Sequence, residues 1–167
     1  MQNIQLSPHF ELREFTESAT AREYGIVNEP PPEAVENLKA LCVNTLEPLR
    51  EALGLPIIIT SGYRCKALNE LITHHSTRSQ HRTGEAADFW VQGSKFKVQS
   101  ASPRELLIRA FRTIITDPTV DYDQLIIYPT FIHVSYISRE RNRHKLTKGF
   151  GNGTYAALSR AQALAIE

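Results

Sequence analysis

Two apolar segments that are separated by a single Pro-Thr pair place the strongest limit on how this chain can fold. Residues 123–128 and 131–137 are rich in β-branched and aromatic side chains, which favours two strands. Because only Pro129 and Thr130 separate them, they are predicted to form an antiparallel hairpin. Helices and strands elsewhere alternate too irregularly for a doubly wound parallel fold. We therefore expect an α+β fold with a small, largely antiparallel sheet flanked by helices.

Other elements follow from helical spacing and from turn residues. An apolar stripe after Pro32 predicts a helix that ends at Gly54. Pro48 lies inside this stripe and lacks a backbone donor, so a kink or break is expected near residues 44–45. The remaining expected elements are strands at 55–60 and 85–91, a short helix through Asn69 and Ile72, a helix that begins with a capping box at 102–105 and ends at 117–118, and a terminal helix at 155–166.

The composition is typical of one globular domain. The chain has 167 residues, of which 41% are hydrophobic, and this is enough to build a core of its own. We expect a single domain over 1–167 that is monomeric, with an irregular or helical N-terminal segment at 1–31 and the core of the site at 55–137. A net charge of +1 gives no electrostatic basis for binding nucleic acid. Cys42 and Cys65 are too few for a disulfide framework and are expected to remain free thiols.

The N-terminus bears on where the protein is expected to act. Residues 1–8 lack the basic start and the long apolar run of a secretory signal. No later run approaches the roughly 18 apolar residues of a membrane span. We therefore expect no membrane span, and a protein that is made in the cytoplasm and stays there unless another process releases it.

Two histidines and one aspartate form a candidate ligand set for a metal ion. His81 precedes Asp88 within one short segment, and His133 lies in the second strand of the expected hairpin. Alternation along the strand at 85–91 places small alanines beside Asp88, which leaves room for an ion. A catalytic zinc ion takes three protein ligands of these types and leaves one position open for water. The set therefore favours a metal-assisted hydrolase.

Each of these residues also has an ordinary interpretation. His81 would be a surface histidine in a polar loop, His133 a half-buried histidine on a sheet, and Asp88 a carboxylate satisfied by backbone donors. An aspartate among alanines and aromatic residues is costly to bury without a cation, however, and this favours the metal. Ser79 and Gly84 are expected to shape the loop, Ser79 by hydrogen bonds to the backbone and Gly84 because it lacks a side chain.

The motifs around this set occur in a fixed order along most of the chain. They are His9-Phe10, Glu14-Phe15, residues 46–50, residues 60–64, Leu68-Asn69, the segment Ser-x-His-x-x-Gly-x-Ala-x-Asp at 79–88, residues 123–126 and residues 132–135. Together they resemble the zinc D-alanyl-D-alanine carboxypeptidases and related endopeptidases of peptidase family M15, in particular its small single-domain branch. The resemblance implies the same fold and a zinc ion held by His81, Asp88 and His133.

The resemblance also implies a substrate, which is a peptide of peptidoglycan, and a role for Arg64. It places Arg64 in the active-site cleft, where a guanidinium binds a substrate carboxylate or stabilises an oxyanion. The alternative is a solvated surface arginine. His74 and His75 are expected in a polar loop at the rim of the cleft, and the basic segment 139–148 on a solvated face.

The general base is where this chain departs from the family pattern. Members typically carry Glu or Asp shortly before the second histidine, often three positions earlier, whereas this chain has Thr130 there and no acid in 126–132. A positioned base normally adds roughly 10² to 10⁴ in rate. We rank Asp123 first as the base and Glu85 second. The third alternative is that no carboxylate base exists and that Tyr128 donates a hydrogen bond to the substrate.

The length of the hairpin turn decides on which face Asp123 lies. With a two-residue turn, Gln124 and Tyr128 share the face of His133, and Asp123 points to the other face. A three-residue loop would reverse that result for Asp123. Glu85 alternates away from Asp88 along its own strand.

The sequence therefore predicts a zinc peptidase that trims a terminal D-alanine or cuts within the stem peptides of peptidoglycan. One alternative is a zinc-holding module of the same fold that binds cell-wall peptide without cleaving it. Another is a phage structural or assembly protein. Because an export signal is missing, the expected origin is a processed chain, or a phage or prophage in which lysis releases the protein to the cell wall.

Overall fold

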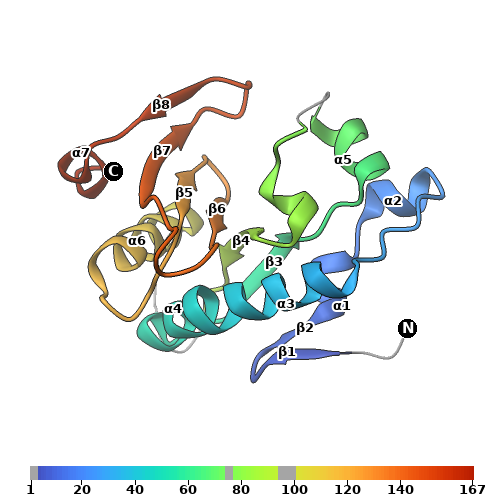
Figure 1. Cartoon of the computed structure of the whole chain (residues 1–167). Helices are drawn as coiled ribbons and strands as arrows, with labels where there is room; N and C mark the ends of the chain where they lie inside the picture. Colours follow the sequence, from blue (N-terminus) through green and yellow to red (C-terminus); the bar gives the residue numbers. More distant parts are fainter. Residues whose placement is uncertain (1–3, 74–76, 94–100) are drawn as a thin grey trace.

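A six-stranded sheet lies at the centre of the molecule (Figure 1). The computed structural model describes residues 4–73, 77–93 and 101–167. From one edge to the other, the strands are β3 (Ile57–Ser61), β4 (Ala86–Val91), β6 (Ile132–Ser135), β5 (Gln124–Ile127), β7 (Lys145–Gly149) and β8 (Tyr155–Ala157). Neighbouring strands are antiparallel except β5 and β7, which are parallel. The predicted α+β class with a largely antiparallel sheet is confirmed.

The hairpin of β5 and β6 has the two-residue turn. The amide of Tyr128 donates to the carbonyl of Phe131 at 3.0 Å, and Ile126 lies directly opposite His133. Gln124 and Ile126 of β5, and Tyr128 directly after this strand, therefore face the same side of the sheet as His133. Asp88 on β4 is the other direct partner of His133. One face of the sheet thus carries two of the predicted ligands on adjacent strands.

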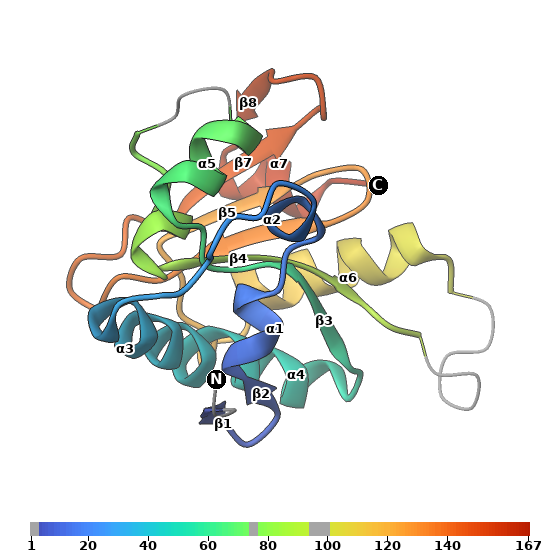
Figure 2. The same cartoon turned by 90° about the vertical axis from the view of Figure 1, so that its right-hand side faces the viewer.

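The opposite face of the sheet is apolar and is covered by helices. Its side chains are Phe89, Leu125, Ile127, Ile132 and Val134, each at most 1% exposed. Helix α6 (Pro103–Thr116) contacts β4 and β5 and packs beside α4 (Glu47–Leu53) (Figure 2). The predicted capping box begins α6, because Ser102 Oγ accepts from the amide of Glu105 at 3.2 Å and the Glu105 carboxylate accepts from the amide of Ser102.

The helix predicted to begin at Pro32 is interrupted near the predicted position. It consists of α3 (Pro32–Leu41), the π-helical segment η1 (Cys42–Leu46) and α4, and Gly54 ends it in the left-handed conformation at φ 63°. Pro48 has no amide hydrogen to donate to the carbonyl of Asn44. The amide of Asp121 donates to that carbonyl instead, at 3.0 Å.

Short elements join these parts. At the N-terminus, β1 (Gln5–Ser7) and β2 (Phe10–Glu11) form a two-stranded sheet and are followed by α1 (Leu12–Thr16) and α2 (Ala19–Glu23). Between β3 and β4 the chain forms α5 (Lys66–Thr73) and the 3-10 helix η2 (Gln80–Thr83). Helix α1 contacts β3 and buries Phe15 completely. These contacts hold the end of β3 in place, and the residues that directly follow β3 form part of the site described below.

The C-terminal part corrects two predictions. Residues 155–157 are not helical but form β8 on the edge of β7, and the terminal helix is only α7 (Arg160–Leu164). Ser159 caps α7 by accepting from the amide of Gln162 at 3.2 Å. The basic segment 139–148 is not solvated throughout, because β7 includes its last four residues and two of these are buried. For residues 155–157, pairing with β7 therefore outweighs the local helix propensity.

The state of the cysteines agrees with the sequence analysis. Cys42 and Cys65 are free, and Cys42 is fully buried. Burial raises the pKa of the Cys42 thiol, which keeps it protonated and unreactive at neutral pH. Across the described ranges, each helix is too short or too polar to cross a bilayer.

Candidate metal centre

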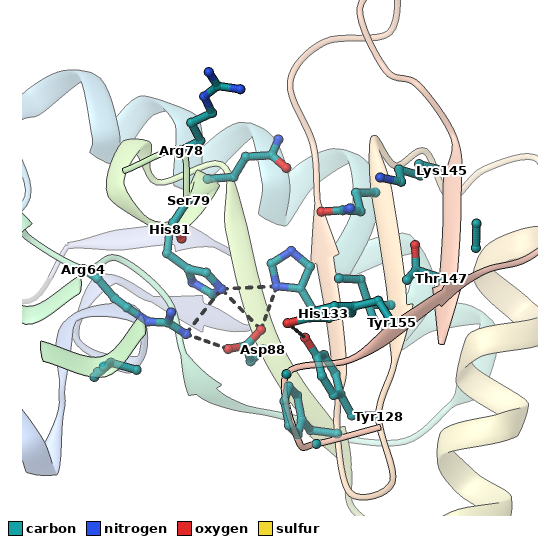
Figure 3. Close-up of a pocket in the computed structure, with 18 residues that line it drawn as sticks. Arg64, Arg78, Ser79, His81, Asp88, Tyr128, His133, Lys145, Thr147 and Tyr155 are labelled. Atoms are coloured by element: carbon teal, nitrogen blue, oxygen red, sulfur yellow. Dashed lines mark hydrogen bonds and ion pairs between the residues drawn. The ribbon is translucent and has the colours of Figure 1, made fainter. Parts of the chain in front are cut away.

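Three side chains from separate elements converge on one point (Figure 3). His81 comes from η2, Asp88 from β4 and His133 from β6. His133 Nδ1 lies 2.8 Å from Asp88 Oδ1, and His81 Nε2 lies 3.2 Å from His133 Nδ1 and 3.3 Å from Asp88 Oδ1. These atoms form the cluster of metal-ligating side chains found among the described residues.

The triangle of ligand atoms has the size that a tetrahedral ion requires. Zinc binds imidazole nitrogen and carboxylate oxygen at about 2.0–2.2 Å, which places neighbouring ligand atoms about 3.3 Å apart in a tetrahedron. The observed separations of 2.8 to 3.3 Å are close to this value. Two nitrogens and one oxygen also match the donor set of catalytic zinc sites. The residues present therefore fit a zinc ion.

The backbone before α5 orients His81. His81 Nδ1 donates to the carbonyl of Gly62 at 2.6 Å, so Nε2 is the nitrogen that faces the other ligands. The amide of Arg64 donates to the carbonyl of His81 at 3.0 Å, which ties η2 to the same segment. Burial lowers the pKa of His81, and a neutral imidazole is the form that binds a metal.

Arg64 binds the Asp88 oxygen that faces away from the two histidines. Its Nη2 donates to Asp88 Oδ2 at 2.8 Å, and its Nε donates to Ser61 Oγ at 3.0 Å. Burial alone would raise the pKa of Asp88, but the electrostatic interaction with His81 and the hydrogen bond from His133 hold it well below its usual range. Asp88 is therefore ionised, with Oδ1 toward the histidines and Oδ2 on Arg64. Arg64 is buried and lines the cavity rather than the outer surface.

Two glycines let this part of the chain approach its neighbours closely. A Cβ on Gly62 would overlap the backbone of Phe15 in α1. A Cβ on Gly84, which has φ 75°, would overlap the backbone of Ala34 in α3. Both glycines therefore allow the segments around His81 to pack closely against α1 and α3. The left-handed conformation of Gly84 agrees with the prediction that this residue shapes the loop.

The structure places Asp123 apart from the three ligands. Its carboxylate accepts hydrogen bonds from Gln80 Nε2 at 3.0 Å, from Ser135 Oγ at 3.3 Å and from the amide and side chain of Arg143. The side chain is fully buried and does not line the cavity. Burial would raise its pKa, but the hydrogen bonds from Arg143 lower the pKa to about 2.

Glu85 also lies away from the cluster. Its carboxylate accepts from Thr83 Oγ1 at 2.9 Å, and it is not among the residues that line the cavity. His74 and His75, which were expected at the rim, lie outside the described residues.

The ligand triangle opens onto a cavity of about 740 Å³. Among the described residues that line it, Asp88 is the only carboxylate. The polar and aromatic side chains around the ligands are Arg64, Arg78, Ser79, Gln80, Gln124, Tyr128, Phe131, Lys145, Thr147 and Tyr155. Arg78, Lys145 and Tyr155 were not predicted as site residues. The predicted terminal helix was extended over Tyr155, which lies in a strand, and Lys145 was assigned to a solvated segment.

Tyr128 is held in the cavity wall by other aromatic rings. It stacks on Phe131 with ring centroids 4.3 Å apart, and its hydroxyl donates to the hydroxyl of Tyr155 at 3.2 Å. A Cβ on Gly149 would overlap the Tyr128 ring, so the glycine makes room for it. Burial and the bond to Tyr155 raise the pKa of Tyr128, which keeps the hydroxyl protonated.

A His-Asp-His triangle at the base of an open cavity is an arrangement of the metallopeptidase class. Comparison with family models agrees: residues 8–115 match the model described as Peptidase M15, and the chain belongs to this family of zinc-dependent peptidases. The matched range includes Arg64, His81 and Asp88, while His133 follows it and is joined to the site by its pairing with Asp88. A search of curated proteins found no match.

Proposed function

We propose that the protein is a zinc peptidase that hydrolyses peptide bonds in the stem peptides of peptidoglycan, as a carboxypeptidase or an endopeptidase. The observation that carries the proposal is the ligand triangle of His81, Asp88 and His133, which has the dimensions of a zinc site and opens onto the cavity. When bound, zinc supplies Lewis-acid chemistry that polarises a peptide carbonyl and activates water. Membership of the M15 family supports the peptidase chemistry.

Two protein groups are proposed to stabilise charge on the substrate. Tyr128 carries a protonated hydroxyl at the cavity wall and donates a hydrogen bond to the reacting carbonyl oxygen. Arg64 holds Asp88 Oδ2 and adds a positive charge at the cavity floor. Both side chains are held in place by other contacts, Tyr128 by Phe131 and Arg64 by Asp88. The Tyr128 hydroxyl, which donates to Tyr155 in the free protein, turns toward the substrate when it binds.

Asp123 is proposed to be a positioning residue rather than the base. Its carboxylate is saturated by Gln80, Ser135 and Arg143, and the low pKa that results makes it a poor proton acceptor. Glu85 is proposed to have no part in catalysis. Without a carboxylate base, proton transfer would pass through solvent in the open cavity, and the rate would be lower than in enzymes that have one.

The test is to incubate the zinc-loaded protein with purified peptidoglycan and defined muropeptides and to identify products by mass spectrometry. We expect wild type to release D-alanine or a cleaved stem peptide. His81→Ala should lose both zinc and activity, while His9→Ala, which changes an exposed histidine on Glu47, should keep both. Stoichiometric zinc in both His81→Ala and a matching His133→Ala variant would overturn the ligand assignment.

A second candidate is a module that holds zinc and binds cell-wall peptide without cleaving it. One observation favours it: the cavity has no carboxylate besides Asp88 among its described lining residues. Peptide binding by zinc-loaded protein, with no product after prolonged incubation, would establish this function. Any product that is absent with His81→Ala would exclude it.

A further inference from the structure

The cavity has two chemically different ends along the direction of the strands. Gln124 on β5 pairs with Lys145 on β7, and two residues further along β5 Ile126 pairs with His133. Tyr128 follows two residues later on the same face. Each step of two residues covers about 7 Å. Lys145 and Tyr128 therefore lie on opposite sides of the metal ligands.

Arg78 lies at the same end as Lys145. Gln80, two residues after Arg78, donates to Asp123, which is the residue before Gln124. The turn before η2 therefore meets the sheet where β5 begins. Figure 3 agrees, with Arg78 and Lys145 on one side of the ligand cluster and Tyr128 on the other.

Charge distinguishes the two ends. Arg64, Arg78 and Lys145 are the cations among the described lining residues, and Asp88 is their one carboxylate counterpart. Asp88 is already engaged with Arg64 and the histidines. Within the described part of the chain, Arg78 and Lys145 form no ion pair. The opposite end presents the aromatic rings and hydroxyls of Tyr128 and Tyr155.

We propose that Arg78 and Lys145 form a subsite for a carboxylate of the substrate, and that this subsite determines which peptides the enzyme accepts. The inference rests on the proposed peptidase function. Lys145 is displaced from His133 by about 7 Å along the strands and, because β5 lies between β6 and β7, by about 10 Å across them. The resulting distance of about 12 Å corresponds to three to four residues of extended peptide. The substrate is therefore a peptide that carries a free carboxylate about three to four residues from the reacting carbonyl, with an uncharged portion at the Tyr128 end.

The test compares a synthetic stem pentapeptide that has free carboxylates with the same peptide in which every carboxylate is an amide. For zinc-loaded protein, kcat/KM is measured if the peptides are cleaved, and Kd is measured by calorimetry in either case. We expect wild type to prefer the acidic peptide by about tenfold, and less at high salt. Arg78→Gln and Lys145→Gln should each reduce the preference about two- to fivefold.

Lys148→Gln is the matched control. Lys148 lies on the same strand as Lys145 but contacts the ring of Phe150 and does not line the cavity, so the preference should not change. The subsite would be overturned if wild type bound both peptides with equal affinity. It would also be overturned if a variant that combines Arg78→Gln and Lys145→Gln kept the preference for the acidic peptide. Failure to cleave either peptide would overturn the peptidase function instead, and the calorimetric comparison would still decide the subsite.

Discussion

At the scale of the residue, the orientation of His81 follows from one hydrogen bond. Its Nδ1 donates to the carbonyl of Gly62, and this carbonyl is in place because Gly62 can approach Phe15 without a side chain. The ligand geometry therefore depends on packing of α1 against the end of β3. A motif search identifies His81 but not this support, because Phe15 and Gly62 are distant in sequence.

Tyr128 is the residue whose replacement tests the proposed chemistry most directly. Tyr128→Phe removes the donor but keeps the ring stacked on Phe131, so the fold and the zinc content should not change. We expect kcat to fall about 10²-fold, as for the loss of one oxyanion donor, with a smaller effect on KM. Steady-state kinetics with a muropeptide would measure this.

Tyr155→Phe is the control for that substitution. It removes the partner of the Tyr128 hydroxyl but leaves the hydroxyl itself, so the loss in kcat should be several times smaller. Equal kcat for Tyr128→Phe and wild type would exclude Tyr128 from the reaction.

At the scale of the element, Asp123 joins three parts of the chain. It binds Gln80 in η2, Ser135 in β6 and Arg143 in the loop before β7. Gln80 directly precedes His81, so this carboxylate fixes the turn that carries one of the proposed metal ligands. Asp123 was expected to be the base because it is close to His133 in sequence. That distance does not reveal that Arg143 forms hydrogen bonds to the Asp123 carboxylate.

Asp123→Asn is expected to destabilise the fold by about 2 kcal/mol at pH 7, because charged hydrogen bonds to Arg143 and Gln80 are lost. Folding lowers the pKa of Asp123 from 3.8 to about 2. The ionised carboxylate therefore stabilises the fold above pH 3.8, and this contribution is lost as the pH falls toward about 2. Urea unfolding at several pH values should show the two proteins converging over that interval.

Activity separates this role from catalysis. The folded, zinc-loaded Asp123→Asn variant should keep kcat within about tenfold of wild type. A loss of about 10² to 10⁴ with zinc retained would make Asp123 the base after all.

At the scale of the whole molecule, the metal is expected to contribute to stability, since its ligands come from three elements. Saturation with zinc at 100 times its Kd adds about 2.7 kcal/mol. Removal by a chelator should therefore lower Tm by about 5–10 °C, and zinc but not calcium should restore it. His133→Ala should have a low Tm that does not respond to the chelator, and a wild-type Tm that also fails to respond would argue against the site.

Much of this architecture follows from short-range patterns. Pro129 and Thr130 predicted the hairpin that aligns Ile126 with His133, and Pro48 predicted the break at η1. The C-terminal strands were not predictable in this way. Lys145–Gly149 contains few apolar residues, and Tyr155–Ala157 has helical composition, so their strand conformation depends on pairing with β5 and with each other.

The β7–β8 hairpin forms one wall of the cavity but provides none of the three candidate ligands. Lys145, Tyr155 and the glycines at 151 and 153 line the cavity from this hairpin, whereas the ligands come from η2, β4 and β6. Mutations in the hairpin can therefore accumulate over evolutionary time without dismantling the metal centre. Exchange of this one segment during evolution would change the cavity wall while keeping the candidate metal centre, and an alternative hairpin could be grafted onto the same scaffold by design.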